Sequence, residues 1–178
     1  MNNFKRNNQL FSMCGLNCGL CTMRLGGHCP GCGHGNRPCR IARCGMEHGV
    51  EYCFQCPEYP CGLYEHVDEY DSFITHLHQK ADMMKAKEIG PDAYTEEQSI
   101  KVKLLDTLLN EYNSGREKTL FSLAVNLLDI DDIKKVLDEG GQLALDMLMK
   151  EKAKYISSRL RETAKEKGIE LKLRKKTK

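Results

Sequence analysis

The fold of this chain is decided by residues 14–61, which read CGLNCGLCTMRLGGHCPGCGHGNRPCRIARCGMEHGVEYCFQCPEYPC. All ten cysteines of the 178-residue chain lie within this segment. They are Cys14, Cys18, Cys21, Cys29, Cys32, Cys39, Cys44, Cys53, Cys56 and Cys61. Three pairs have the spacing Cys-x-x-Cys, in which a tight turn presents two sulfurs to one tetrahedral metal ion. The segment therefore predicts a metal-binding module whose candidate ligands are these ten cysteines.

Zinc is the metal that we expect, at about two ions per chain, because eight thiolates fill two tetrahedral sites. Two of the Cys-x-x-Cys pairs, at residues 29–32 and 53–56, have a separation typical of a zinc ribbon. The many glycines and prolines of the segment favour tight turns and leave few large apolar side chains for a core. We therefore expect the zinc to be structural and the segment to depend on it for folding.

Histidine could complete a ligand set in this segment. His34 and His48 follow cysteines at spacings that allow ligation, but the thiolates already suffice for two ions. We expect both histidines to remain outside the ligand sets. The sequence leaves open which cysteines share an ion.

Two other uses of ten cysteines compete with zinc. A disulfide framework is disfavoured because residues 1–8, MNNFKRNN, lack the apolar core of a secretory signal. We therefore expect a cytoplasmic, reducing location in which thiols stay free. An iron–sulfur protein is the second alternative, with a [4Fe–4S] cluster at Cys14, Cys18 and Cys21. That spacing is the one used by radical-SAM enzymes, but the residues that follow predict helices and not the barrel of such enzymes.

The cysteine-rich segment resembles a known family. The stretches CGLNCGLC at 14–21, CRIARC at 39–44 and GVEYCFQCPEYPC at 49–61 are similar to the bacterial and archaeal family catalogued as domain of unknown function 3795. The resemblance covers residues 12–61 and continues less distinctively through Glu88-Ile89-Gly90-Pro91. It implies zinc binding and implies no particular activity. Relatives often carry a further cysteine where this chain has Asn36, so a ligand set using that position must be completed differently here.

After residue 61 the apolar residues recur every three or four positions, which predicts helices. Five are expected, over residues 62–90, 95–112, 120–128, 131–141 and 143–168. The third is apolar on nearly all faces and should be buried. The apolar stripe of the first should consist of Tyr64, Val67, Tyr70, Ile74, Leu77, Ala81 and Met84. The last should turn inward Leu143, Leu148, Tyr155, Ile156 and Leu160.

Charge is distributed in three blocks. The formal net charge of +2 is the sum of +3 over residues 1–61, −9 over 62–149 and +8 over 150–178. Residues 169–173 alternate apolar and polar, which predicts a short strand or extended arm. Residues 174–178 form a basic run that we expect to be a flexible surface tail. Such a tail can contact phosphates weakly but makes a poor specific site, so nucleic acid is not the expected partner.

The sequence therefore predicts a mainly α fold in which an N-terminal cysteine-rich zinc-ribbon or knuckle module precedes a body of four or five helices. The expected domains are a flexible N-terminus (1–12), the metal module (13–61), the helical body (62–168) and the short extended segment with its basic tail (169–178). No stretch approaches the roughly 18 apolar residues of a membrane span, so we expect no membrane contact.

Protein recognition or regulation is the expected role, with a protein partner. A nucleic-acid-binding zinc ribbon ranks third, after the iron–sulfur alternative. No nucleotide-binding glycine loop, Ser-His-Asp set or paired carboxylates stand out. We therefore assign no catalytic residues and favour a protein without enzymatic activity.

Overall fold

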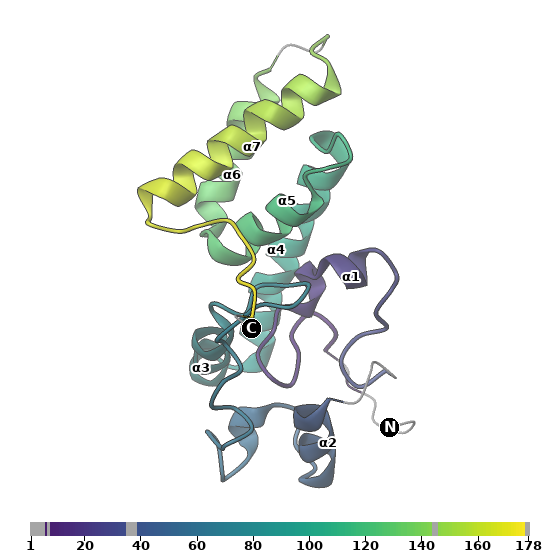
Figure 1. The fold of residues 1–178 in the computed structure, drawn as a ribbon, viewed down its shortest axis with the longest axis vertical. Coiled ribbons are helices and arrows are strands. Elements are labelled where there is room, and N and C mark those ends of the chain that lie inside the picture. The colour runs from purple at the N-terminus through teal and green to yellow at the C-terminus, as the bar shows by residue number, and fades with distance from the viewer. Residues whose placement is uncertain (1–5, 7, 35–38, 144–145, 177–178) are drawn as a thin grey trace. The chain divides into compact units, whose positions relative to one another are not determined.

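The computed structural model describes residues 6, 8–34, 39–143 and 146–176 (Figure 1). This part of the chain is mainly helical and contains no β-strand, so the expected mainly α class is confirmed. The elements are the short 3-10 helices η1 (Cys18–Leu20) and η2 (Cys53–Gln55) and the α-helices α1 (Thr22–Leu25), α2 (Arg40–Glu47), α3 (Gln79–Ile89), α4 (Pro91–Glu111), α5 (Lys118–Leu127), α6 (Ile130–Gly141) and α7 (Met149–Glu166).

The chain forms two compact units. The first comprises Met1–Ser99 together with Leu173–Lys178, and the second comprises Ile100–Lys172. Compactness therefore groups residues 62–99 with the cysteine-rich segment. Whether residues 13–61 fold as a separate metal-dependent module remains a prediction.

An aromatic core holds the first unit together. Its fully or nearly fully buried members are Phe11, Tyr52, Tyr64, Met83, Ala86 and Tyr94. Partly buried Cys14, Cys53 and Cys61 pack against this cluster. Phe11 belongs to residues 1–12, for which the sequence predicts a flexible N-terminus, but its side chain is fully buried. Its ring centroid is 4.6 Å from that of Tyr94. The cysteine-rich segment thus shares its core with the helices that follow it.

Residues 62–78 differ from the expectation. The apolar stripe predicts a helix over 62–90, but 62–78 form turns and bends, and only Gln79–Ile89 is helical. Tyr64 and Ile74 are buried as expected, whereas Tyr70, Leu77 and Met84 are exposed. The physical reason is the buried carboxylate of Asp71, which accepts a hydrogen bond from the backbone N–H of His76 at 2.7 Å and so closes a turn. The buried face of α3 consists of Gln79, Met83 and Ala86.

The junction between α3 and α4 is a single glycine. Gly90 has φ +90°, a conformation that glycine adopts without strain, and it ends α3 as the sequence predicts. Pro91 then begins α4, four residues earlier than expected. Proline suits the first helical position because its fixed φ fits the helix and its missing N–H has no partner there.

The second unit contains a packed group of helices, α5, α6 and α7, with α6 and α7 side by side (Figure 1). Every residue of α5 from Leu120 to Leu127 is buried, which confirms the expectation of a buried helix. Helix α6 begins one residue earlier than the expected 131, and Asp129 occupies its N-cap position.

The last helix also departs from the sequence analysis. It begins at Met149, so Leu143 and Leu148 lie before it, and residues 144–145 are outside the described part. Leu148 and Tyr155 are exposed, and the buried face consists of Ala153, Ile156, Leu160 and Ala164.

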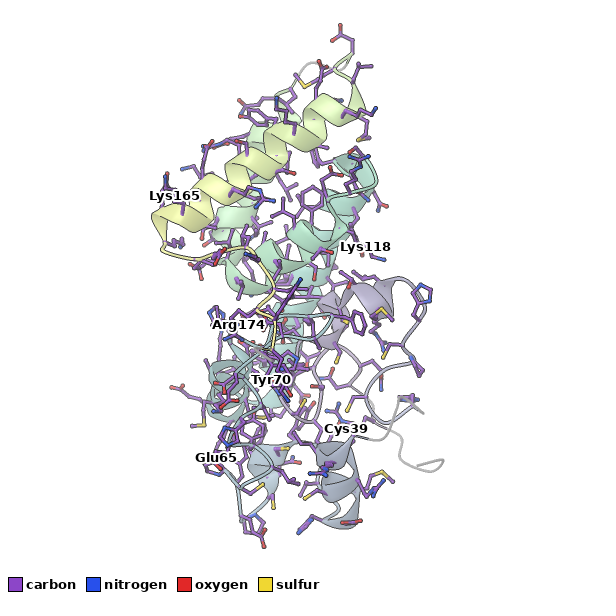
Figure 2. The ribbon with its side chains drawn as sticks, viewed as in Figure 1. Cys39, Glu65, Tyr70, Lys118, Lys165 and Arg174 are labelled. Atoms are coloured by element: carbon purple, nitrogen blue, oxygen red, sulfur yellow. The ribbon has the colours of Figure 1, made fainter. Side chains whose placement is uncertain are left out.

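The C-terminal segment is an irregular stretch in which Leu171 is buried. Of the two expected forms of residues 169–173, a short strand or an extended arm, the strand is absent from this described part of the chain. Arg174, which is labelled in Figure 2, does not belong to a free tail, because its main chain and side chain contact Asp71. Residues 177–178 of the expected basic tail lie outside the described residues. Among the helices that the structure describes, none combines the length and apolarity that crossing a bilayer requires.

Candidate metal centre

Two of the three Cys-x-x-Cys pairs form the same tight turn. The N–H of Cys21 donates to the carbonyl of Cys18 at 3.2 Å, and the N–H of Cys56 donates to the carbonyl of Cys53 at 3.0 Å. Each turn is a single turn of 3-10 helix, η1 in the first pair and η2 in the second. The two turns belong to neighbouring stretches of chain, since the N–H of Cys53 donates to the carbonyl of Met13 at 3.0 Å.

Cys44 is supplied by helix α2. His48 follows it one helical turn later, and its Nδ1 lies 2.8 Å from the carbonyl oxygen of Cys44 and 3.6 Å from the Cys44 sulfur. The carbonyl can only accept, so Nδ1 carries the hydrogen and His48 is a donor beside this thiol. The structure therefore brings His48 next to a candidate ligand.

One small cavity is lined by four cysteines. Its volume is about 30 Å³, and Cys44, Cys53, Cys56 and Cys61 all line it together with His48. A cavity of this size has room for one water-sized body. The remaining walls are mostly apolar and include Ile41, Val50, Leu63 and the rings of Tyr59 and Tyr64.

A second group of cysteines surrounds the N-terminal turn. Cys18 lies close enough to Cys14, Cys21 and Cys32 for their negative charges to act on its pKa. Cys39 acts on the pKa of Cys14 in the same way. Cys29 falls in neither group, although it is the partner of Cys32 in the third Cys-x-x-Cys pair.

Helix α3 positions the loop that carries Cys14. The carbonyl of Cys14 accepts hydrogen bonds from the Tyr64 hydroxyl and from the Gln79 side-chain amide, both at 2.8 Å. Gly15 follows with φ +93°, and a Cβ there would lie 2.5 Å from the backbone oxygen of Gln79. Only glycine fits this close approach of the loop to the start of α3.

A buried network of polar side chains also holds the loop that carries Cys14. The Asn17 amide donates to Asp82 at 3.0 Å, and the Tyr94 hydroxyl donates to the Asn17 side-chain oxygen at 3.0 Å. The network therefore ties the loop to both α3 and α4.

Burial keeps several of the free thiols protonated. It raises the pKa of Cys14 to about 11, although the nearby Ser12 hydroxyl opposes the shift. It raises the pKa of Cys53 to about 12, with the charges of Cys14 and Cys61 adding to the effect. The pKa of Cys18 is also raised, first by burial and then by the charge of Cys14. Thiols of this kind lose their protons when a cation binds, because a metal ligates the thiolate.

The ten cysteines, all of them described, are free thiols. Within the described part of the chain, no three Cys, His, Asp or Glu side chains lie close enough together to hold a metal ion as they stand. The expected ligand role of all ten cysteines remains a prediction. Asn36 lies outside the described residues.

Two features of this region have no sequence signal. One is the contact of Arg174 with Asp71, which are 103 residues apart. The other is a large open cleft of about 740 Å³ that adjoins the four-cysteine cavity and shares Tyr59, Cys61 and Tyr64 with it. Comparisons of the chain with protein-family models, with curated proteins and with solved structures found no match.

Proposed function

We propose that this protein binds zinc through two sets of cysteine thiolates and that the zinc has a structural role. The observation that carries the proposal is the cavity lined by Cys44, Cys53, Cys56 and Cys61. Four thiols around a space for one small body match the ligand number and the soft donor type that zinc prefers in structural sites. Zinc binding would require the four sulfurs to move toward the centre of this cavity and lose their protons.

The second proposed set is Cys14, Cys18, Cys21 and Cys32. Its support is that Cys14, Cys21 and Cys32 lie near enough to Cys18 for their thiolate charges to raise its pKa; Cys39 acts in the same way on Cys14, and Cys14 and Cys32 on Cys53. The same set favours the alternative function, in which it holds a [4Fe–4S] cluster, because it contains the Cys-x-x-x-Cys-x-x-Cys spacing plus a fourth thiol. Cys29 and Cys39 are the two cysteines left over from two four-thiolate sites.

A structural role for the metal follows from how the cysteines are packed. Cys14, Cys53 and Cys61 contact the aromatic core that also contains Met83, on α3, and Tyr94, on α4. Drawing the thiolates together around an ion would therefore fix the walls of this core. A segment so rich in glycine buries too little apolar surface to be stable by itself, and such a cross-link would supply the missing stability.

The role that we propose for the folded protein is recognition of a protein partner in the cytoplasm. Its support is the exposure of three apolar side chains on the turn-rich segment, Tyr70, Phe73 and Leu77, of which Phe73 is 61% exposed. Exposed apolar side chains mark an interaction site where they form one contiguous patch. The resemblance of residues 12–61 to the family catalogued as domain of unknown function 3795 remains part of this proposal.

Metal analysis of the purified protein tests the proposal. Protein produced without added iron should contain about two zinc ions per chain. Serine at Cys44, Cys53, Cys56 or Cys61 should lower the zinc content to about one, whereas Cys29→Ser is the matched control and should retain both. Substitution of zinc by Co(II) should give the intense charge-transfer absorption band of thiolate ligands.

Two results would contradict it. Iron and sulfide near four per chain after anaerobic preparation, with brown colour, would favour the iron–sulfur alternative. Protein that binds no metal and keeps its full helical signal under a strong chelator would remove the structural role altogether.

A further inference from the structure

A cleft in the second unit gathers positive charge. Its volume is about 450 Å³, within the range of small-molecule pockets, and its walls come from α7 and from the residues where α5 begins. Helices α5 and α7 pack against each other within this unit (Figure 1). The cleft is lined by four basic side chains and one carboxylate, which are Arg116, Lys150, Lys154, Arg161 and Glu117. Four cations less one anion leave an excess of three positive charges.

The cations of α7 lie on one face of the helix. Lys154 follows Lys150 by four residues and Arg161 follows Lys154 by seven, so the three side chains project from the same side. All three are exposed, as is Arg116. Ser157 lies on the same face and also lines the cleft, and its hydroxyl has no hydrogen-bond partner in the described part of the chain. Two separate segments thus bring hydrogen-bond donors and positive charge to one space.

Other cations at the same helix already have partners. Arg159 pairs with Glu139 at 2.6 Å, and Lys167, which follows the helix, pairs with Asp132 at 2.8 Å. Both carboxylates belong to α6. By contrast, none of the four basic side chains of the cleft forms an ion pair with a carboxylate of the described residues. Their charges are therefore available to an anion from outside the chain.

The one carboxylate of the cleft is engaged by its own turn. Glu117 accepts hydrogen bonds from the backbone N–H of Ser114 at 2.7 Å and from that of Arg116 at 3.1 Å. It also accepts from the Ser114 hydroxyl at 3.0 Å. These donors offset its negative charge, so Glu117 opposes an anion in the cleft less than a carboxylate without partners would.

We propose that this cleft binds a small molecule that carries two or more phosphate groups. Each phosphate monoester carries a charge of about −1.5 to −2 at neutral pH, so two of them match the positive excess of the lining. Arginine and lysine donate charge-assisted hydrogen bonds to phosphate oxygens. Among the described residues that line the cleft none is aromatic, so it offers no ring on which a nucleic-acid base could stack. A compact phosphorylated molecule therefore fits this space better than a nucleic-acid strand.

Titration of the full chain with inorganic triphosphate tests this inference. At about 0.15 M salt, the triphosphate should shift the amide resonances of residues 116–120 and 150–161 in proton–nitrogen correlation NMR spectra. Orthophosphate should bind about tenfold more weakly, because one phosphate group contacts fewer of the four cations. Residues 116–161 contain no cysteine, so a chain that binds no zinc would overturn the proposed function and leave this titration unchanged.

Two lysine variants of the same helix separate the cleft from general charge attraction. Lys154→Met should weaken triphosphate binding about fivefold or more, because it removes a charged donor of the cleft. Lys152→Met is the matched control, since Lys152 belongs to α7 and does not line the cleft, and it should change the affinity less than about twofold.

Three results would overturn the inference. The first is an equal loss of affinity in the two variants, which would show that binding follows net charge alone. The second is a set of resonance shifts confined to residues 14–61, or no shifts at all at about 10 mM triphosphate. The third is tighter binding of a single-stranded oligonucleotide than of triphosphate, lost in Lys154→Met, which would assign the cleft to a nucleic-acid strand.

Discussion

The contact between Asp71 and Arg174 is the ion pair whose removal should have the largest effect on the first unit. The Asp71 carboxylate is fully buried, at 0% exposure, and Arg174 is 37% exposed. The carboxylate accepts from the Arg174 backbone N–H at 2.7 Å and from its guanidinium at 2.8 and 3.3 Å. It also accepts from the His76 N–H at 2.7 Å. One side chain thus joins the turn at 71–76 to the C-terminal segment.

The magnitude follows from burial and hydrogen bonding. Removing one partner of a buried ion pair costs about 3–5 kcal/mol, and Arg174 is only partly buried. We therefore expect Asp71→Ala to lower the free energy of unfolding by about 3 kcal/mol, the lower end of that range. Arg174→Ala keeps the backbone hydrogen bond and should cost about 2 kcal/mol, since hydrogen bonds to charged groups contribute about 1.5–3 kcal/mol. Lys175→Ala, which removes the same charge one position later, should cost less than about 0.5 kcal/mol.

A double-mutant cycle measured by urea unfolding, followed by circular dichroism, checks these values. The coupling between Asp71→Ala and Arg174→Ala should be about 1.5 kcal/mol. Arg174→Lys should recover only part of it, because a lysine ammonium cannot reproduce the fork of the guanidinium. A coupling near zero, or a Lys175→Ala effect as large as that of Arg174→Ala, would refute the reasoning.

The pH dependence supplies an independent check. Burial opposes ionisation of Asp71, but the hydrogen bonds from Arg174 and His76 outweigh it and lower the pKa of the carboxyl below its usual value. A carboxyl whose pKa is lower in the folded state stabilises the protein above its unfolded pKa of about 3.9, and this contribution is lost as the pH falls through the folded pKa. The coupling energy should therefore be the same at pH 7 and pH 5. A coupling that already declines between those values would not come from this carboxylate.

Three further predictions concern the stability of the first unit. A strong chelator under reducing conditions should make the first unit protease-sensitive, α3 included, while the helical circular dichroism of residues 100–172 persists; loss of all helicity in one step would contradict this. Gly15→Ala should cost about 2–4 kcal/mol in urea unfolding, because φ is +93° and the Cβ would meet the Gln79 carbonyl, whereas Gly62→Ala, with open space around it, should cost less than about 0.5 kcal/mol. Tyr94→Phe should cost about 1–2 kcal/mol in the same assay, since it removes the hydroxyl that donates to the buried Asn17.

The periodicity of apolar residues predicted the helices whose position depends only on their own residues. Helix α5 is apolar on nearly all faces and is buried from Leu120 to Leu127, so its pattern was sufficient. Gly90 and Pro91 likewise mark a helix boundary through their own backbone preferences. Residues 62–78 carry a helical pattern but form turns. The Asp71 carboxylate closes the turn by accepting from the His76 N–H and also accepts from Arg174, 103 positions away, and no local pattern reports the second contact.

In the candidate metal site, too, the features set by neighbouring residues could be predicted and those set by tertiary packing could not. The turns at Cys18–Cys21 and Cys53–Cys56 could be predicted, because the geometry of each depends on four consecutive residues. The grouping of Cys44 with Cys53, Cys56 and Cys61 could not, because helix α2 carries Cys44 to that cavity through tertiary packing. Lys80 and Met84 lie one turn apart on α3 and so share a face, but no local pattern places Tyr59 and Cys61 at the same cleft.

The packing of Cys14 links metal binding to helix α3 within the first unit. Its sulfur belongs to the second proposed ligand set, while its carbonyl accepts hydrogen bonds from Tyr64 and from Gln79, the first residue of α3. Tyr64 in turn lines both the four-cysteine cavity and the large cleft. A change at either set of thiols would therefore shift groups that hold α3 in place. For this reason, metal removal should reduce the protection of α3 amides from hydrogen exchange.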